Sequence, residues 1–245
     1  EMSDSLWTLW IFFILASLKL ICNLYGYKSS DFEVHRTWFV KTNQLDLKDW
    51  YKFEDFALDY PPLFAYFQYL LSLILVRLDS DFNSKLSFFS LILQRATVVF
   101  LDFFLVLAIK YYCKKESTIA VVLVLTQFSL WMVDHVHFQY NGFLLAILIF
   151  ACALVEKKRY KSGAFVFTIL LNFKHIFLYC APAFFLVLLK EYVLEKKEEK
   201  FTYYDKKLKK QIEMKRNPEA NTTFLERFFY LSQIVVWTTF VLWLP

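Results

Sequence analysis

Glycine is scarce in this sequence, and its scarcity excludes one large group of functions. The chain has 245 residues but only three glycines, Gly26, Gly142 and Gly163, which lie far apart. Loops that bind nucleotide phosphates in P-loop and Rossmann proteins need several glycines close together. Both kinds of nucleotide-binding site are therefore excluded.

Cysteine is nearly as scarce. The four cysteines are scattered and none belongs to a C-x-x-C pair. This pattern predicts neither a disulfide framework nor a zinc site. The net charge of +5 is small, and the basic residues fall in short runs beside apolar segments. Such runs are typical of topology signals in membrane proteins, so we expect no nucleic-acid partner.

Apolar residues are abundant. The chain is 58% hydrophobic and 21% aromatic, with a mean hydropathy of +0.39, well above an ordinary globular domain. Long apolar runs recur along it, which predicts an all-α polytopic membrane protein. The first run, 6–25, lacks the basic segment and the cleavage site of a signal peptide, so we expect a retained span. The expected spans are 6–25, 88–109, 117–133, 142–155, 162–172, 176–189 and 228–244.

The basic clusters predict the orientation of these spans. They lie at 110–115, 156–161 and 190–216, and positively charged loops are typically cytosolic. The residues 27–86 then form one lumenal loop, in which the short apolar run 62–76 is an interfacial or re-entrant helix. A helical bundle follows at 88–189. The segment 190–227 is expected to be a cytosolic loop of helix ends and flexible linker.

One cluster of polar residues interrupts two apolar runs and faces the non-cytosolic side in this arrangement. Polar groups at membrane depth are costly unless they are partnered or lie beside water. Two of them are histidines, but no third metal ligand is evident, so hydrogen bonding to a polar ligand is favoured over a metal site. The cluster consists of Asp134, His135, His137, Gln139, Tyr140 and Asn141.

Asp31 lies six residues after the first span, against the membrane face, with Glu33, His35 and Arg36 close by. A carboxylate in this place is a candidate general base for a sugar hydroxyl. The alternative is a solvated surface charge. Asp59 precedes a helix that starts with proline, where it could bind substrate or simply favour the helix N-terminus.

Four further polar residues lie beside or within the spans. Lys174 and His175 lie where two short spans meet, and a lysine there could bind an anionic phosphate or extend to the interface. Arg95 and Asp102 are seven residues apart within one span and share a helical face. We expect these two to bond neighbouring helices inside the bundle.

Four stretches in this order resemble the dolichyl-phosphate-glucose-dependent α-1,3-glucosyltransferases of the endoplasmic reticulum, which assemble the lipid-linked oligosaccharide for N-glycosylation. The stretches are "SDFEVHRTW" (30–38), "LDYPPLFAYFQYLLS" (58–72), "VDHVHFQYNGF" (133–143) and "NFKHIFLYCAPAF" (172–184). The resemblance covers 6–245, about half the length of a family member. "FEVHR", "DHVHFQYNGF" and "FKHIFLY" are more similar to the enzyme that adds the second glucose than to the enzyme that adds the first.

The resemblance implies a GT-C fold with interfacial helices in the first lumenal loop. It also implies inverting transfer, without metal or cofactor, from dolichyl phosphate glucose to the dolichyl-diphosphate-linked oligosaccharide Glc1Man9GlcNAc2. Asp31 would be the general base, and the polar cluster with Lys174 and His175 would bind the donor. Three alternatives stay open: the first glucosyltransferase acting on Man9GlcNAc2-PP-dolichol, a lipid transporter, and an inactive structural paralogue.

Overall fold

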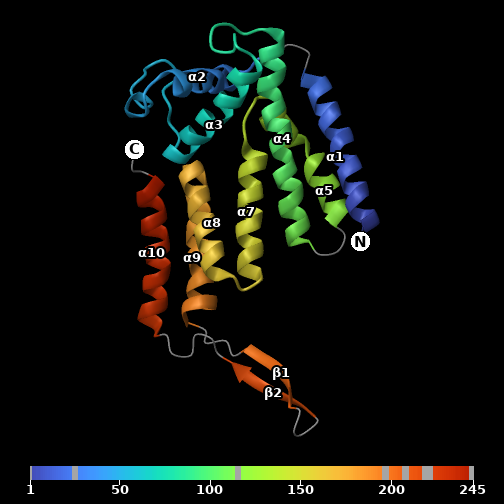
Figure 1. The fold of residues 1–245 in the computed structure, drawn as a ribbon, viewed down its shortest axis with the longest axis vertical. Coiled ribbons are helices and arrows are strands. Elements are labelled where there is room, and N and C mark those ends of the chain that lie inside the picture. Colours follow the sequence, from blue (N-terminus) through green and yellow to red (C-terminus); the bar gives the residue numbers. More distant parts are fainter. Residues whose placement is uncertain are drawn as a thin grey trace.

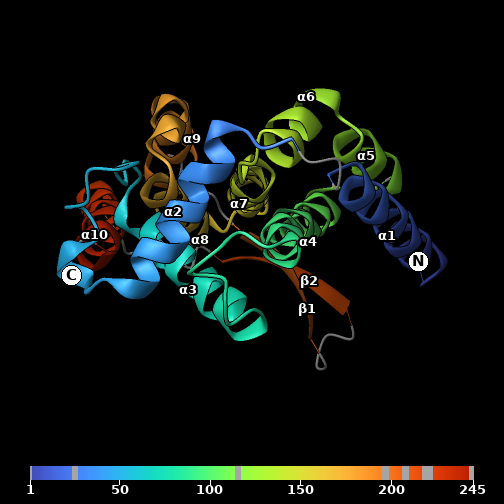
Figure 2. The same ribbon diagram turned by 90° about the horizontal axis from the view of Figure 1, so that it is seen from above.

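The computed structural model describes residues 2–23, 27–113, 117–194, 199–205, 210–216 and 223–242 of the chain. These residues are helical almost throughout, and the strands among them form one short antiparallel hairpin. Most helices run side by side as a bundle, while α2 and α3 lie across one end of it (Figures 1 and 2). The predicted all-α class therefore describes this part of the chain apart from the hairpin.

The helices at the N-terminal side of the bundle are α1 (Met2–Asn23), α4 (Phe88–Tyr112) and α5 (Ser117–Leu125), which contact one another. The start of α4 is a capping box, in which the side chains of Ser87 and Ser90 each bond the backbone of the other residue. At 25 residues α4 is about 37 Å long, enough to cross a hydrocarbon core of about 30 Å.

The predicted span 117–133 is broken in the structure. After α5 the chain bends by 48° and continues as α6 (Phe128–Leu130) and a π-helix (Trp131–Val136). Thr126 lies at the break, and its hydroxyl donates a hydrogen bond to the carbonyl oxygen of Val122 at 2.7 Å. Such back-bonding of threonine often bends a helix. The π-helix beyond the bend carries Asp134 and His135 and contacts α1 and α4.

The next two helices, α7 (Asn141–Glu156) and α8 (Tyr160–Phe173), form an antiparallel pair. Gly163 of α8 lies close against the last turns of α7. A Cβ at this position would lie 2.6 Å from Cγ2 of Val155 and 3.2 Å from the carbonyl oxygen of Ala151. Only glycine allows this approach without a shift of α8.

The last helices follow a 3₁₀ helix (His175–Cys180). They are α9 (Ala181–Leu188), a π-helix (Leu189–Leu194) and α10 (Phe224–Leu242). Between them β1 (Glu199–Asp205) pairs with β2 (Lys210–Arg216), with Glu199 opposite Arg216. At 199–205 and 210–216 this hairpin corrects the prediction of helix ends and flexible linker for 190–227. The short alternation of apolar residues in the two strands lies among many charged residues and was not recognised as a strand signal.

The layer over the end of the bundle consists of α2 (Ser30–Gln44), a 3₁₀ turn (Leu47–Asp49) and α3 (Pro62–Leu78). The Ser29 side chain caps α2 by accepting a hydrogen bond from the Phe32 amide. Aromatic rings attach this layer to the bundle, because they come from α2, α3 and the chain before α7 and pack edge to face. The most buried of these residues are Phe32, Trp38, Phe39, Phe64, Phe138 and Tyr140.

Two described helical runs, Phe88–Tyr112 and His175–Leu194, are long and apolar enough to cross a membrane. The bent segment Ser117–Leu125 with Phe128–Val136 makes a third if it counts as one span. Among the other predicted spans, 6–25 and 142–155 correspond to the shorter apolar helices Leu6–Ile21 and Asn141–Glu156. The spans predicted at 162–172 and 228–244 correspond to α8 and α10. All four stay predictions.

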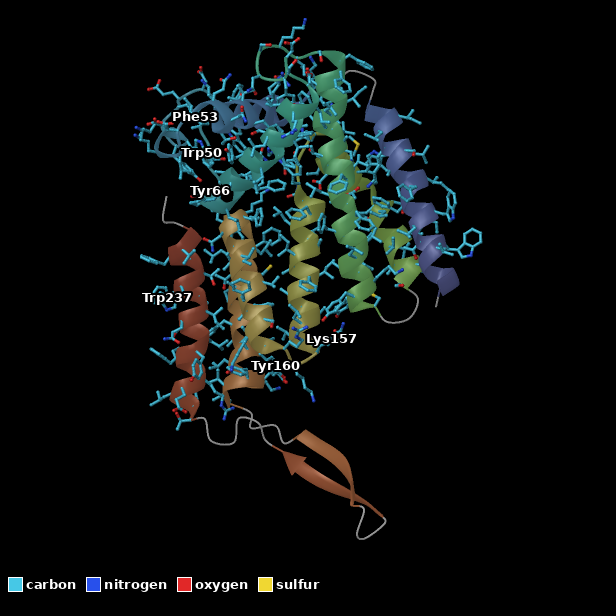
Figure 3. All side chains as sticks on the ribbon, viewed as in Figure 1. Trp50, Phe53, Tyr66, Lys157, Tyr160 and Trp237 are labelled. Atoms are coloured by element: carbon cyan, nitrogen blue, oxygen red, sulfur yellow. The ribbon has the colours of Figure 1, made fainter. Side chains whose placement is uncertain are left out.

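The two ends of the bundle differ in character. Lys157 and Tyr160 lie at the end away from α2 and α3, whereas Trp50 and Tyr66 lie in the α2–α3 layer (Figure 3). The loop joining α7 to α8 is at the first end, and the chains leading into α7 and α9 are at the second (Figure 1). The basic loop 156–161 therefore lies at the end of the bundle opposite the polar residues that precede α7 and α9.

Candidate functional site

The chain between the π-helix and α7 turns sharply at Phe138, which has a φ of 72°. A bulky residue in this left-handed region is uncommon and is kept there by its surroundings. The Phe138 ring is fully buried and packs against Phe32 at 5.2 Å and Tyr140 at 5.6 Å between ring centroids. The turn places His137 and Gln139 on the surface that faces α2.

Asp31, in the first turn of α2, lies against this turn. Nε2 of Gln139 donates a hydrogen bond to Oδ2 of Asp31 at 2.5 Å, and Nε2 of His137 lies 3.4 Å from the same oxygen. The Asp31 side chain is 29% exposed and that of His137 is 44% exposed. Ser29 adds a hydrogen bond from its hydroxyl to the His137 carbonyl oxygen. The sequence had predicted functional roles for Asp31, His137 and Gln139, and the structure brings the three together.

Lys174, at the end of α8, joins the same cluster from the other side. Its Nζ lies 3.0 Å from Oδ1 of Asn141 and 3.4 Å from Oε1 of Gln139, and 5.1 Å from the centre of the Tyr60 ring. Burial lowers the pKa of Lys174, while the nearby carboxylates of Asp134, Asp31 and Asp59 act in the opposite direction. The amine is therefore half-buried among acceptors, where an anion would stabilise its charged form.

The side chain of Asp134, from the π-helix, lies at the N-terminus of α7. It is 1% exposed and accepts hydrogen bonds from the backbone amides of Asn141 and Gly142 and from the Asn141 side chain. An acceptor at a helix N-terminus satisfies amides that have no partner inside the helix. At Gly142 a Cβ would lie 3.1 Å from Oδ1 of Asp102 and 3.3 Å from Oδ2 of Asp134, so a glycine leaves room for both carboxylates.

A second polar cluster lies deeper in the bundle. Oδ2 of Asp102 is 2.6 Å from Nζ of Lys19 and 3.0 Å from Nε2 of His135, and all three side chains are nearly fully buried. Arg95 donates to the carbonyl oxygens of His135 at 2.7 Å and of Tyr27 at 2.5 Å. These contacts confirm the prediction that Arg95 and Asp102 bond neighbouring helices. His135 lies in this deeper cluster and does not contact Asp31.

Lys19 is the residue of this deeper cluster that the sequence reading missed. A signal was present, because a single lysine inside the apolar run 6–25 needs a partner if it is to be buried. Its partner Asp102 lies 83 residues further along the chain, so only the folded bundle shows the pair.

Several other candidate residues have partners inside the fold. The His35 ring is 3% exposed and surrounded by aromatic rings, and burial lowers its pKa from 6.5 to about 3, so it stays neutral. Arg36 donates to the carbonyl oxygens of Phe82 and Lys85. The Tyr140 hydroxyl is 2.8 Å from that of Thr97.

The remaining three candidates are more accessible. Glu33 is half-buried on α2, near Arg36. Asp59 is exposed and close enough to Lys174 to affect its charge, and His175 is exposed next to Lys174 in the chain. Among the described residues none donates a hydrogen bond to Oδ1 of Asp31, and the side chain is 29% exposed, so this oxygen is available to a ligand. A half-exposed carboxylate beside an ammonium and an imidazole suits proton transfer next to an anionic group.

Fold and cluster together define a helical membrane protein with a carboxylate site at one end of its bundle. Residues 12–245 match the model of the ALG6, ALG8 glycosyltransferase family. The chain belongs to this family.

Individual proteins similar to this chain support the same family membership. The chain is 38% identical over 214 residues to a protein of Kluyveromyces lactis, 37% identical over 216 residues to one of Saccharomyces cerevisiae, and 41% identical over 186 residues to one of Bos taurus. All three are named dolichyl pyrophosphate Glc1Man9GlcNAc2 alpha-1,3-glucosyltransferase. The matches cover 81%, 82% and 68% of this chain but 38%, 37% and 35% of the relatives, so the chain spans less than two fifths of their length.

Proposed function

We propose that the protein containing this chain transfers glucose from dolichyl phosphate glucose to Glc1Man9GlcNAc2-PP-dolichol, forming an α-1,3 linkage. The acceptor is the one that the relatives' names give. The family membership and the motifs "FEVHR", "DHVHFQYNGF" and "FKHIFLY" support this reading. The site would face the lumen of the endoplasmic reticulum, at the end of the bundle opposite the basic clusters.

The observation that carries the proposal is the position of Asp31. Its Oδ2 accepts a hydrogen bond from Gln139, with His137 nearby, while no described residue donates to its Oδ1 and the side chain is partly exposed. In the proposed reaction this second oxygen accepts the proton of the acceptor hydroxyl. The hydroxyl oxygen forms a bond to the anomeric carbon of glucose as the bond from that carbon to the phosphate oxygen breaks. Attack from the face opposite the phosphate converts the β-linked glucose to an α-linked one.

Lys174 and His137 supply the electrostatic part of the proposal. The departing dolichyl phosphate is an anion, and positioned hydrogen-bond donors stabilise charge that develops on it. An ammonium has three donors, and two of those of Lys174 point to Gln139 and Asn141, which leaves a third for a phosphate oxygen. The exposed His175 and Asp59 would extend the site toward sugar hydroxyls, as would the half-buried Glu33. His35, Arg36 and Tyr140 would shape its floor.

The experiment is complementation with the complete gene. In cells that lack their own Glc1Man9GlcNAc2 glucosyltransferase, its expression is expected to convert the accumulated lipid-linked oligosaccharide to the diglucosylated form. Chromatography of the released, labelled oligosaccharides measures this conversion. Rescue only of cells that accumulate Man9GlcNAc2-PP-dolichol would support the first glucosyltransferase instead. No conversion in either strain, with the protein present in the membrane, would overturn the proposal.

A further inference from the structure

The side-chain amide of Gln139 has a single orientation that suits its neighbours. An ammonium can only donate hydrogen bonds and an ionised carboxylate can only accept them. Gln139 lies between one of each, with Oε1 3.4 Å from Nζ of Lys174 and Nε2 2.5 Å from Oδ2 of Asp31. The reverse orientation would place oxygen against oxygen and nitrogen against ammonium. The chemistry of its neighbours therefore fixes which end of Gln139 faces Asp31.

Asn141 is oriented in the same way and reinforces Gln139. Its Oδ1 accepts from Lys174 at 3.0 Å, so its amide nitrogen must face away from the lysine. This nitrogen donates to Oε1 of Gln139 at 2.8 Å and to Oδ1 of Asp134 at 2.9 Å. A single amide group thus links the surface glutamine to a buried carboxylate.

Asp134 anchors this series of bonds to the backbone. Its Oδ1 accepts the Asn141 amide at 3.1 Å as well, and its Oδ2 accepts the Gly142 amide at 2.5 Å. The carboxylate is 1% exposed and is held at the start of α7 by groups that cannot rotate. Its position follows from the geometry of the helix N-terminus, and it is too deeply buried to contact a sugar.

We propose that Asp134 is a positioning residue for the base Asp31, acting through Asn141 and Gln139. The three residues keep the Gln139 donor on Oδ2 of Asp31, and so keep Oδ1 turned toward the acceptor hydroxyl. The proposal rests on the proposed role of Asp31 as the base. It replaces the expectation that Asp134 binds substrate with a role in orientation.

The test compares steady-state kinetics of Asp134→Asn with those of the wild type, in microsomes that contain the complete protein. An amide at 134 puts an NH₂ group against the amides of α7, so Asn141 loses its acceptor or turns. We expect kcat to fall about 10- to 100-fold, because misplacing a reacting group by about 1 Å costs this much, with little change in KM for either substrate. An unchanged kcat in a normally folded variant would overturn the proposal.

A double variant separates positioning from general damage. Gln139→Met removes the amide at nearly constant volume and breaks the link to Asp31. If Asp134 acts through Gln139, then Asp134→Asn/Gln139→Met is expected to be no slower than Gln139→Met alone. Losses that multiply would show that Asp134 acts by another route and would also overturn the proposal.

Two further variants keep the outcome unambiguous. Asp79→Asn is the matched control, because Asp79 is likewise a carboxylate bound near a helix start, by Ser87 and Ser90 of α4, but belongs to no part of the site. It is expected to leave kcat unchanged. Should Asp134→Asn fail to fold, Asn141→Ser tests the same link while keeping both backbone donors to Asp134, with the same expected loss. If Asp31→Asn were fully active, Asp31 would not be the base, and the proposed function itself would fail.

Discussion

Asp31 and Asp102 are two carboxylates of the same chain with opposite surroundings. Asp31 is 29% exposed and has one oxygen that no described residue bonds, whereas Asp102 is 2% exposed and lies between Lys19 and His135. An accessible carboxylate can exchange a proton with a ligand, and a buried, paired one mainly holds helices together. The cluster around Asp31 is therefore the proposed reactive site, and the cluster around Asp102 holds helices together.

The pH dependence of stability is expected to report the buried ring of His35. Burial lowers its pKa in the folded protein from 6.5 to about 3, with Asp31 acting against this shift and Lys174 adding to it. Below pH 6.5 the unfolded chain therefore binds a proton that the folded chain does not, so stability falls as pH falls from 6.5 toward 3. At pH 5.5 the loss from this ring is about 1.4 kcal/mol. Thermal unfolding in detergent between pH 7.5 and 5 measures it.

The variant that isolates this effect is His35→Phe, which keeps an aromatic ring among Trp38, Phe64 and Phe138. Its melting temperature is expected to depend less on pH than that of the wild type. His175→Phe is the control, because the exposed His175 has no such surroundings and its loss should leave the dependence unchanged. Equal pH dependence in wild type and His35→Phe would contradict the buried neutral ring.

The sequence could predict much of the site because its polar residues interrupt apolar runs, where they are conspicuous. Asp31, His137, Gln139, Asn141 and Lys174 were all predicted and all meet. What the sequence could not show is which way each side chain points, into the fold or toward the surface. His35 and His137 look alike as letters, but the helical phase of α2 buries the first and the left-handed turn at Phe138 exposes the second.

At the scale of elements, the buried ion pair of Lys19 and Asp102 ties α1 to α4, and His135 adds the π-helix to the same point. Arg95 reinforces this junction through carbonyl oxygens on both sides of it. The same junction holds the chain on either side of the site, since Tyr27 precedes α2 and His135 precedes the Phe138 turn. This buried contact therefore helps to fix the positions of the two chain segments that carry the surface cluster.

Breaking this pair from one side is expected to be costly. Lys19→Met leaves Asp102 without its ammonium in a buried position, which should lower the free energy of unfolding by about 3–5 kcal/mol. Adding Asp102→Leu removes the uncompensated charge and should recover part of the loss. Lys28→Met, at an exposed lysine just before α2, is the control and should be nearly neutral. Thermal unfolding in detergent measures all four proteins, and a neutral Lys19→Met would contradict the buried pair.

The sequence predicted most helices of the bundle but not their interruptions. The N-terminal starts of α3 and α4 are marked by proline and serine residues that can be recognised directly in the sequence. The 48° bend after α5 lies at the back-bonded Thr126, and the two π-helices depend on how neighbouring helices pack, so hydropathy alone could predict neither. The hairpin at β1 and β2 was missed because its alternation is short and lies among many charges: Phe201 and Tyr203 in one strand are opposite Met214 and Ile212 in the other.

At the scale of the whole molecule, the bundle has a basic end and a polar end, and the proposal places the polar end in the lumen. Single cysteines at His175 and Arg159, in a protein without its other cysteines, test this orientation, because both residues are exposed and lie at opposite ends of α8. In intact microsomes an impermeant thiol reagent is expected to label Arg159→Cys only. Opening the vesicles should make His175→Cys reactive. The reverse pattern would contradict a lumenal site.

The measurement that tests the central claim most directly is glucose transfer by Asp31→Asn in microsomes that contain the complete protein. The change keeps the shape of the side chain and removes its ability to accept a proton. We expect transfer from dolichyl phosphate glucose to fall by about 10²–10⁴-fold with normal expression. Asp46→Asn, at an exposed acidic residue of the same loop, should transfer glucose at the wild-type rate. Near-normal transfer by Asp31→Asn would show that Asp31 is not the base and would contradict the account.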